Sequence, residues 1–291
     1  MGDLIQDFPL YRELFGLSFL ASLVVGLVLP LVGALMDLRK EAFLGIAVPQ
    51  FAAAGVALGL FLLPSFPPLV EYFLDHGHPP MAYLLPFAGG AAVLCLFAFS
   101  LMRRGNGRAD AHLAGAFALA SALALLFLSK SPAGKNLADT LMRGEILLLD
   151  IHGLEVLATA CLGCLVFLVL MRRVLIAVAF DRDQAVSLGM PIRRAETLQF
   201  LLLGIVIGAG VMTVGPILVY GLLFLPPLAA RQLATGLASF LRLVVVAGLV
   251  AVLAAWPISL AWDWPYGPSA VCVAGVEVIL AALAARLLGG R

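Results

Sequence analysis

Long apolar runs cover most of this 291-residue chain and leave only short polar segments between them. Hydrophobic residues make up 63% of the sequence and charged residues 12%, whereas soluble globular domains are about half apolar and about a quarter charged. A helix needs roughly 20 predominantly apolar residues to cross the hydrocarbon core of a bilayer. The pattern therefore predicts an all-α integral membrane protein, with residues 1–291 forming a single membrane domain.

Most of the apolar runs have the length of one membrane-spanning helix. One run, from Thr197 to Ala230, is too long for a single crossing. Gly215-Pro216 interrupts this run and Pro226-Pro227 interrupts it again, and proline removes a backbone donor, so we expect a broken helix pair there. The result is a predicted bundle of eight or nine spans. The remaining predicted spans are Leu14–Met36, Phe43–Leu63, Met81–Met102, Leu113–Leu128, Leu154–Met171, Leu243–Trp262 and Pro268–Leu288.

The basic residues predict how the chain is oriented in the membrane, because Lys and Arg are enriched on the cytoplasmic side. An external N-terminus and a cytoplasmic C-terminus place fourteen of the 18 Lys and Arg residues in cytoplasmic segments. We therefore expect a protein of the bacterial inner membrane in this orientation, surrounded by lipid. The formal net charge is only +1, which argues against a nucleic-acid partner.

A short polar segment between two apolar runs carries the start and stop signals of a helix. Asp181 or Asp183 can cap its N-terminus, and Gly189 suits the left-handed residue that follows a helix end. Pro191 prevents the helix from continuing. We expect a brief capped helix over residues 181–191, and the orientation places it in the cytoplasm.

Four segments, in order along the chain, resemble the membrane subunits of ABC importers for zinc, manganese and iron. They are Gly144–Leu147, Phe180–Arg194, Val214–Arg231 and Trp264–Ser269, and the second is similar to the family pattern Phe-Asp-(x)n-Leu-Gly-x-Pro-x-Arg. The resemblance implies a permease subunit without enzymatic activity that pairs with a second copy of itself. It also implies a cytoplasmic ATPase dimer, which binds the ATP, and a periplasmic solute-binding protein. The coupling helix implied by the resemblance comprises Asp181, Asp183, Leu188, Gly189, Met190 and Pro191.

One motif of this family is altered in the chain. Family members carry Gly-Asp-(x)3-His near the start of the second helix, and this Asp and His suit a divalent transition metal as ligands. Ile46 and Gln50 stand at these two positions. A bare divalent ion needs compensating ligands to cross hydrocarbon. Either other residues supply them, or the metal travels in an organic chelate along a pathway lined by Ile46, Pro49, Gln50 and Tyr220.

A few ionisable residues are candidates for metal contacts. Glu277 is the only acidic residue deep in a predicted span, and an intramembrane carboxylate is a functional hypothesis by default. A glutamate that merely packs between helices is the alternative. His76, His78 and His152 lie in or beside segments that we expect outside the membrane, where a solvated connector is the simpler interpretation.

The first functional hypothesis is therefore an importer that moves zinc, manganese or iron, free or chelated, by alternating access. A proton-coupled secondary transporter would instead use Glu277 as a relay and would need no ATPase. A membrane scaffold or sensor would carry no cargo. The capped helix at residues 181–191 argues against the secondary transporter, and the break at Gly215-Pro216 argues against the scaffold.

Overall fold

The computed structural model describes the backbone of residues 8–41, 43–76, 79–102, 109–131 and 151–288, and this part of the chain forms helices and no strands. Nine of its helices are long and apolar enough to cross a membrane, which confirms the predicted all-α bundle of about nine spans. They are α2 (Phe8–Leu38), α3 (Leu44–Leu62), α5 (Met81–Met102), α6 (Ala109–Lys130), α8 (Ile151–Leu170), α11 (Ile192–Val214), α12 (Pro216–Leu233), α13 (Leu237–Trp262) and α14 (Tyr266–Leu288).

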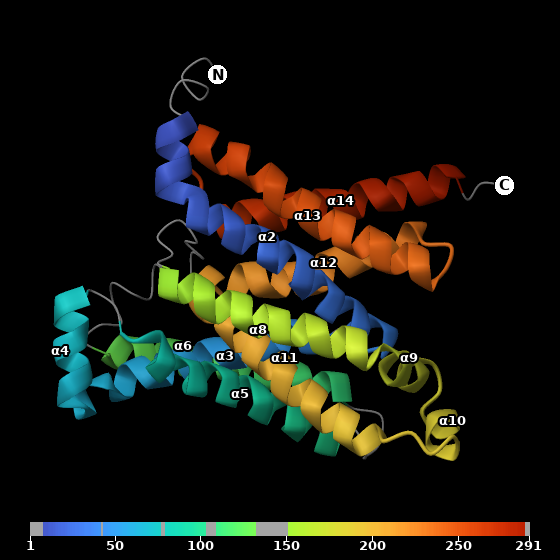
Figure 1. Ribbon diagram of the computed structural model, residues 1–291, viewed down its shortest axis with the longest axis horizontal. Helices are drawn as coiled ribbons and strands as arrows, with labels where there is room; N and C mark the ends of the chain where they lie inside the picture. Colours follow the sequence, from blue (N-terminus) through green and yellow to red (C-terminus); the bar gives the residue numbers. More distant parts are fainter. Residues whose placement is uncertain (1–7, 42, 77–78, 103–108, 132–150, 289–291) are drawn as a thin grey trace.

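Shorter elements lie at the two ends of the bundle (Figure 1). The 3-10 turn η1 (Leu63–Ser65) leads into α4 (Pro67–His76), which runs across the direction of the spans at one end. Helices α9 (Arg172–Phe180) and α10 (Arg182–Ser187) lie at the opposite end. A membrane around the spans therefore places α4 and α10 on different sides.

The centre of the bundle is formed by α2, α3, α11 and α12, which pack on several neighbours each. Completely buried side chains on these four helices include Leu29, Leu60, Ile207 and Leu222. In contrast, α6 and α14 bury only about a fifth of their apolar windows within the chain (22% and 17%). These two helices therefore leave broad apolar faces for lipid or for another protein.

The predicted break between α11 and α12 is confirmed at Gly215. Gly215 adopts φ 80°, a conformation that suits glycine, and its N–H donates to the Val211 carbonyl. Pro216 follows as the first residue of α12, where its missing N–H breaks no helical hydrogen bond. The two helices therefore meet at a sharp turn.

The second predicted break, at Pro226-Pro227, is wrong because α12 continues through both prolines to Leu233. Each proline removes the donor for the carbonyl four residues earlier, and for Pro227 that carbonyl belongs to Leu223. The backbone of Gly33 in α2 lies directly against this carbonyl. Neighbouring protein thus covers the freed group and allows the helix to continue inside a membrane.

Candidate transport surface and coupling helix

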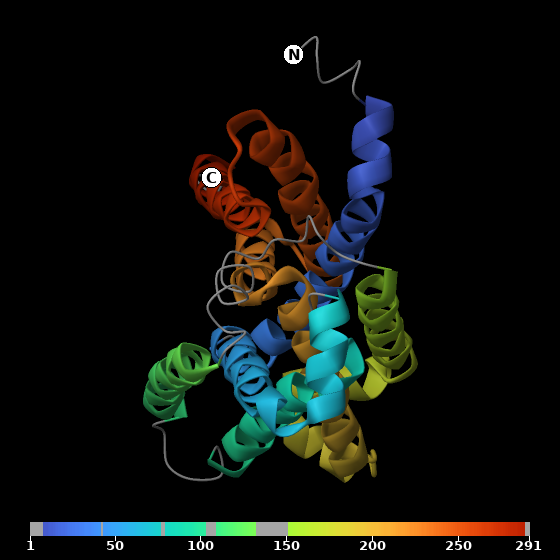
Figure 2. The ribbon, with the colours of Figure 1, turned by 90° about the vertical axis from the view of Figure 1, so that its left-hand side faces the viewer.

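Four helices form one side of the molecule, in the order α6, α3, α12, α14. Helix α3 packs on α6 and on α12, and α12 packs on α14. Figure 2 shows the four helices along the left side of the bundle. The other sides of α3 and α12 are covered by α5, α11, α2 and α13, so their open faces both belong to this side.

On α3, the residues that replace the family's metal ligands lie on this open face. Ile46 and Gln50 are one helical turn apart and both are half-buried. Phe43 and Phe61 extend the same face and are exposed. Pro49 is buried inside the chain and does not lie on this open face, so its role in lining a pathway stays a prediction. Its ring projects about 100° away from Gln50 around the helix axis.

On α12, the partly exposed residues recur every three or four positions, so they form one open face of the helix. Tyr220 and Phe224 are half-buried, while most residues on the other sides of the helix are buried. This face ends at the exposed Leu228 and Arg231. Tyr220 therefore belongs to the same surface as Ile46 and Gln50.

Gln50 and Tyr220 also lie at similar depth in the bundle. Gly45 of α3 lies beside Leu223 of α12, where a methyl group added to the glycine would meet the Leu223 Cβ at 3.5 Å. After this crossing, α3 runs toward the end of the bundle that carries α4, whereas α12 starts at that end and runs away from it. Gln50 follows Gly45 by five residues and Tyr220 precedes Leu223 by three, which moves both toward the α4 end by roughly 8 and roughly 5 Å.

Glu277 is placed differently from these residues. Both of its carboxylate oxygens are buried, and neither accepts a hydrogen bond within the described part of the chain. It lies three helical turns after Tyr266, whose hydroxyl donates to the Val252 carbonyl of α13. The next residue, Val278, accepts a hydrogen bond from Gln232 of α12. The Glu277 carboxylate is thus enclosed among α12, α13 and α14.

The described residues contain no cluster of three or more His, Cys, Asp or Glu side chains that could hold a metal ion. His152 contacts Glu155 at 3.6 Å (Nδ1 to Oε2), and both side chains are exposed on α8. His78 and the His76 side chain lie outside the described residues. The predicted histidine candidates therefore do not come together as a site in the part of the chain that can be described.

Two polar features of the bundle were not predicted from the sequence. Gln199 is completely buried in α11, and its Oε1 has no hydrogen-bond partner among the described residues. Asp37 at the end of α2 pairs with Arg231 at the end of α12, at 2.9 Å between Oδ1 and the guanidinium. The sequence could have indicated the buried Gln199, because it is a polar residue between the apolar residues Leu198 and Phe200. Nothing local in the sequence signals the ion pair.

The predicted capped helix is α10, and its ends have the expected hydrogen bonds. Asp181 caps the N-terminus, where its Oδ1 accepts from the Gln184 N–H at 2.9 Å. At the other end Gly189 adopts φ 69° and donates to the Val186 carbonyl. The Met190 N–H reaches back to the Ala185 carbonyl, which completes a Schellman motif. The side chain of Asp183 lies outside the described residues.

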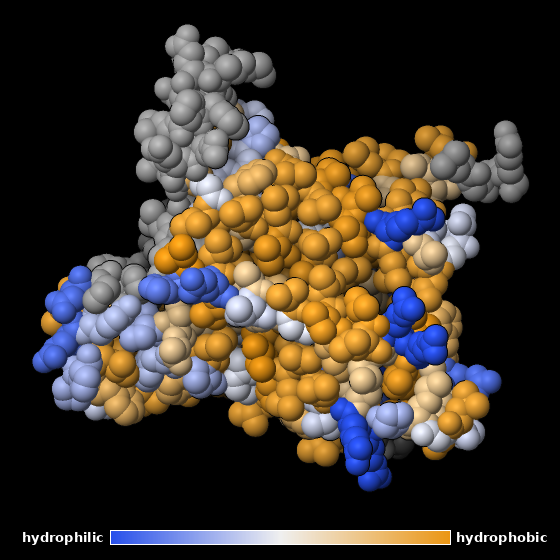
Figure 3. Space-filling view, viewed as in Figure 1, coloured by the Kyte–Doolittle hydropathy of each residue, from blue (hydrophilic) through white to orange (hydrophobic). Residues whose placement is uncertain are grey.

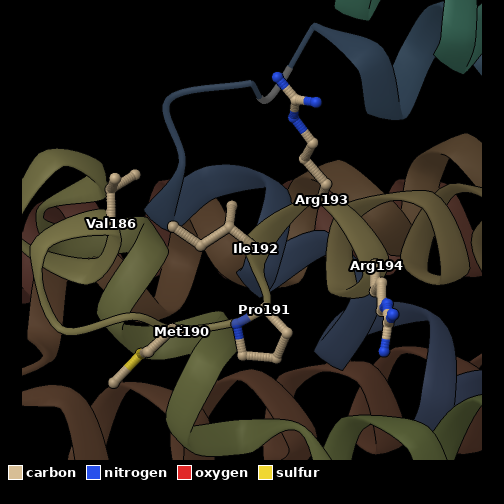
Figure 4. Close-up of a pocket in the computed structure, with 6 residues that line it drawn as sticks. All are labelled: Val186, Met190, Pro191, Ile192, Arg193 and Arg194. Carbon is tan, nitrogen blue, oxygen red and sulfur yellow. The ribbon is translucent and has the colours of Figure 1, made fainter.

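The surface around α10 combines exposed apolar groups with positive charge. Phe180, Val186 and Leu188 are large apolar side chains that α10 and its flanks leave exposed. A hollow of about 340 Å³ lies between α10 and the start of α11. Figure 4 shows the side chains of Arg193 and Arg194 pointing in different directions from the start of α11. The hollow is lined by Val186, Met190, Pro191, Ile192, Arg193 and Arg194.

Comparison with known proteins identifies the family. The profile of the ABC 3 transport family matches residues 12–285. The manganese transport system membrane protein MntC of Halalkalibacterium halodurans is 25% identical over 280 residues, which cover 93% of this chain and 89% of the relative. The chelated iron transport system membrane protein YfeC of Yersinia pestis is 27% identical over 233 residues, covering 79% and 72%.

A solved structure has the same fold. PsaBC from Streptococcus pneumoniae, determined in complex with Fab, superposes with a TM-score of 0.76 at 20% identity, and the match covers 95% of each chain. The family match extends over nearly the whole sequence, and the structural likeness shows that the fold is shared. The chain belongs to the ABC 3 transport family, whose relatives include membrane proteins of manganese and iron transport systems.

Proposed function

We propose that this chain is the permease subunit of an ATP-driven importer that carries a transition metal, zinc, manganese or iron, into the cytoplasm. The observation that carries the proposal is α10, which is capped at both ends and exposes Val186 and Leu188 to solvent. A short rigid helix with an apolar surface is suited to docking on a soluble partner, here a cytoplasmic ATPase dimer. ATP would bind to that partner.

The proposed orientation puts α10 in the cytoplasm and α4 outside. Exposed arginines gather at the α10 end of the bundle, as expected for the cytoplasmic side. A periplasmic solute-binding protein would then deliver cargo at the α4 end. The exposed arginines of the α10 end are Arg172, Arg173, Arg193, Arg194, Arg231, Arg242 and Arg286.

We propose that the surface formed by α6, α3, α12 and α14 faces a second copy of the chain, and that cargo passes along it. Gln50 and Tyr220 are its central polar groups, and both have unburied surface. They offer an amide and a phenolic hydroxyl, which form directional hydrogen bonds with polar cargo. ATP binding and hydrolysis on the partner would switch this surface between outward- and inward-facing states.

The same surface favours a pre-ligated cargo over a bare ion. Ile46 offers no ligand, and within the described residues no acidic, His or Cys cluster lies elsewhere to compensate. A chelate brings its own ligands, so the desolvation cost of the ion is met before it enters the protein. The name of the relative from Yersinia pestis mentions chelated iron, and the name of the relative from Halalkalibacterium halodurans mentions manganese.

The test is metal accumulation in cells that carry the complete transporter, measured by elemental analysis. Zinc, manganese and iron are offered both as free ions and as chelates, and a transporter with an inactive ATPase is the control. Accumulation of a chelate that requires the active ATPase is the expected result. Uptake that continues with the inactive ATPase while the proton gradient is intact would instead support a secondary transporter. ATP-dependent uptake of free ions but not of chelates would contradict the proposal that the cargo is a chelate.

A further inference from the structure

An apolar groove lies between α2, α8, α9 and α13 at the end of the bundle that carries α10. Its volume is about 210 Å³, and all but one of its lining residues are apolar. On α2 the lining extends from Leu31 to Leu38, about 10 Å along the helix axis. Leu168 and Val169 of α8 also line it, and Leu168 packs against the buried cluster that contains Leu35. The groove is therefore a strip of hydrocarbon surface that no helix of the described chain fills.

The exception among the lining residues is Arg172, the first residue of α9. Arg172 is exposed, and no carboxylate of the described residues lies within ion-pair distance of it. Arg173 and Arg242 are exposed on neighbouring positions of α9 and α13. Asp37, the acidic residue of α2 nearest to the groove in sequence, is already paired with Arg231. The mouth of the groove is therefore positively charged.

The hydropathy of this face agrees with the position of the groove near the membrane surface. Figure 3 shows a broad hydrophobic band across the middle of the face, with strongly hydrophilic residues toward its two ends. Helices α8 and α13 approach the right-hand end of this face, where α9 follows α8 (Figure 1). Arg172 follows the end of the α8 span at Leu170 by two residues, so a membrane around the spans would place it near the headgroup region, a position that arginine favours in membrane proteins.

We propose that the groove binds one phospholipid with an anionic headgroup. One acyl chain would lie along the groove over Leu35 of α2 and Leu168 of α8, and the headgroup phosphate would pair with Arg172. An apolar groove alone would accept any lipid. The uncompensated guanidinium at its mouth provides the preference for negative charge, because basic residues close to the membrane surface attract anionic lipids.

A lipid in this position would connect α9 to the spans. Leu175 and Ile176 of α9 line the groove together with Leu237 and Leu241 of α13. Helix α9 ends at Phe180, and Asp181 begins the cap of α10. The bound lipid would therefore stabilise the segment that positions α10. This consequence for coupling rests on the proposed function, whereas the lipid site itself does not.

Native mass spectrometry of the full-length protein, purified in mild detergent, tests the site directly. Phosphatidylglycerol and phosphatidylcholine with identical acyl chains are titrated separately. We expect one phosphatidylglycerol to be retained per chain, with an affinity that falls about fivefold in Arg172→Gln, since each basic residue near the surface contributes about 1 kcal/mol. Arg286→Gln is the matched control, because Arg286 is exposed at the same end and does not line the groove.

A second variant tests the groove rather than the charge. Val169→Trp adds a large side chain at a position that is 57% exposed, so it fills the groove without disturbing the core. We expect it to reduce retention of both lipids, while glycerol phosphate without acyl chains competes with neither. Equal retention of phosphatidylglycerol and phosphatidylcholine by the unmodified protein, or unchanged retention in Arg172→Gln, would overturn the proposal. The measurement involves no transport, so its failure would leave the proposed function standing.

Discussion

The backbone of Gly33 in α2 packs directly against the carbonyl oxygen of Leu223 in α12. That carbonyl has no helical donor, because the residue four positions later is Pro227. The two residues therefore act together. Pro227 removes the hydrogen bond to the Leu223 carbonyl, and Gly33 allows α2 to approach closely enough to cover that carbonyl. This crossing lies beside Gly45, where α3 begins its open face.

Gly33→Ala should destabilise the protein, because the added methyl group would overlap the backbone of Leu223 and not a movable side chain. Overpacking of this kind costs about 1–3 kcal/mol. The measurement is thermal unfolding in detergent. Gly16→Ala is the control in the same helix, since a methyl group there meets no atom within 4 Å. Equal unfolding midpoints for both variants would contradict the close crossing.

Gly189→Val should uncouple ATP hydrolysis from uptake in the reconstituted transporter. Gly189 adopts φ 69°, which a β-branched residue resists at a cost of about 1–2 kcal/mol. Space is not the cause, because a methyl group at this position meets nothing within 4 Å. Gly189→Asn is the matched variant, since asparagine tolerates the left-handed conformation. Normal uptake in Gly189→Val would contradict the role of α10 as a coupling helix.

The ion pair between Asp37 and Arg231 should stabilise the ends of α2 and α12 by only about 1 kcal/mol, because the Arg231 side chain is 60% exposed. A double-mutant cycle with Asp37→Asn and Arg231→Gln measures the coupling free energy by chemical denaturation. High salt should reduce this coupling. A coupling energy near zero would mean that the contact is not energetically significant.

Ile46→Asp combined with Gln50→His should increase retention of free divalent metal by the purified transporter. Both positions lie on the open face of α3, one turn apart, so the two new ligands could bind one ion together. Metal content is measured by elemental analysis after dialysis. Ile46→Leu with Gln50→Leu supplies no metal ligand at either position and serves as control. If the two double variants retain the same amount of metal, these positions do not line the pathway.

Glu277→Gln should reduce uptake more than it reduces stability. The carboxylate is enclosed and unpartnered among the described residues, so a neutral amide of the same shape costs no hydrogen bond of the folded chain. Uptake and the thermal midpoint are measured on the same preparation. Full uptake with an unchanged midpoint would mean that Glu277 only packs between helices.

Several features of this fold could be predicted from local sequence, because backbone chemistry alone fixes them. Proline following glycine ended one helix and began the next at residue 215. Aspartate and glycine at the two ends of α10 satisfied its terminal hydrogen bonds as predicted. Each of these outcomes depends on hydrogen bonds between residues a few positions apart.

Other features depended on which helices became neighbours. Pro227 resembles Pro216 in the sequence, yet the helix continues at Pro227 because Gly33, far away in the chain, lies against the freed carbonyl. Pro49 and Gln50 are adjacent in sequence, but one is buried and the other belongs to the open face.

The sequence by itself determined the membrane class, a count of eight or nine spans, the turn at Gly215 and a capped helix over residues 181–191. The tertiary structure decided which face of each span is open, how Glu277 is enclosed and where Arg172 meets a groove. The physical reason is that lipid and protein interior are both apolar, so a spanning helix shows little difference between its buried and its open side. Only the packing of neighbouring helices distinguishes the two sides.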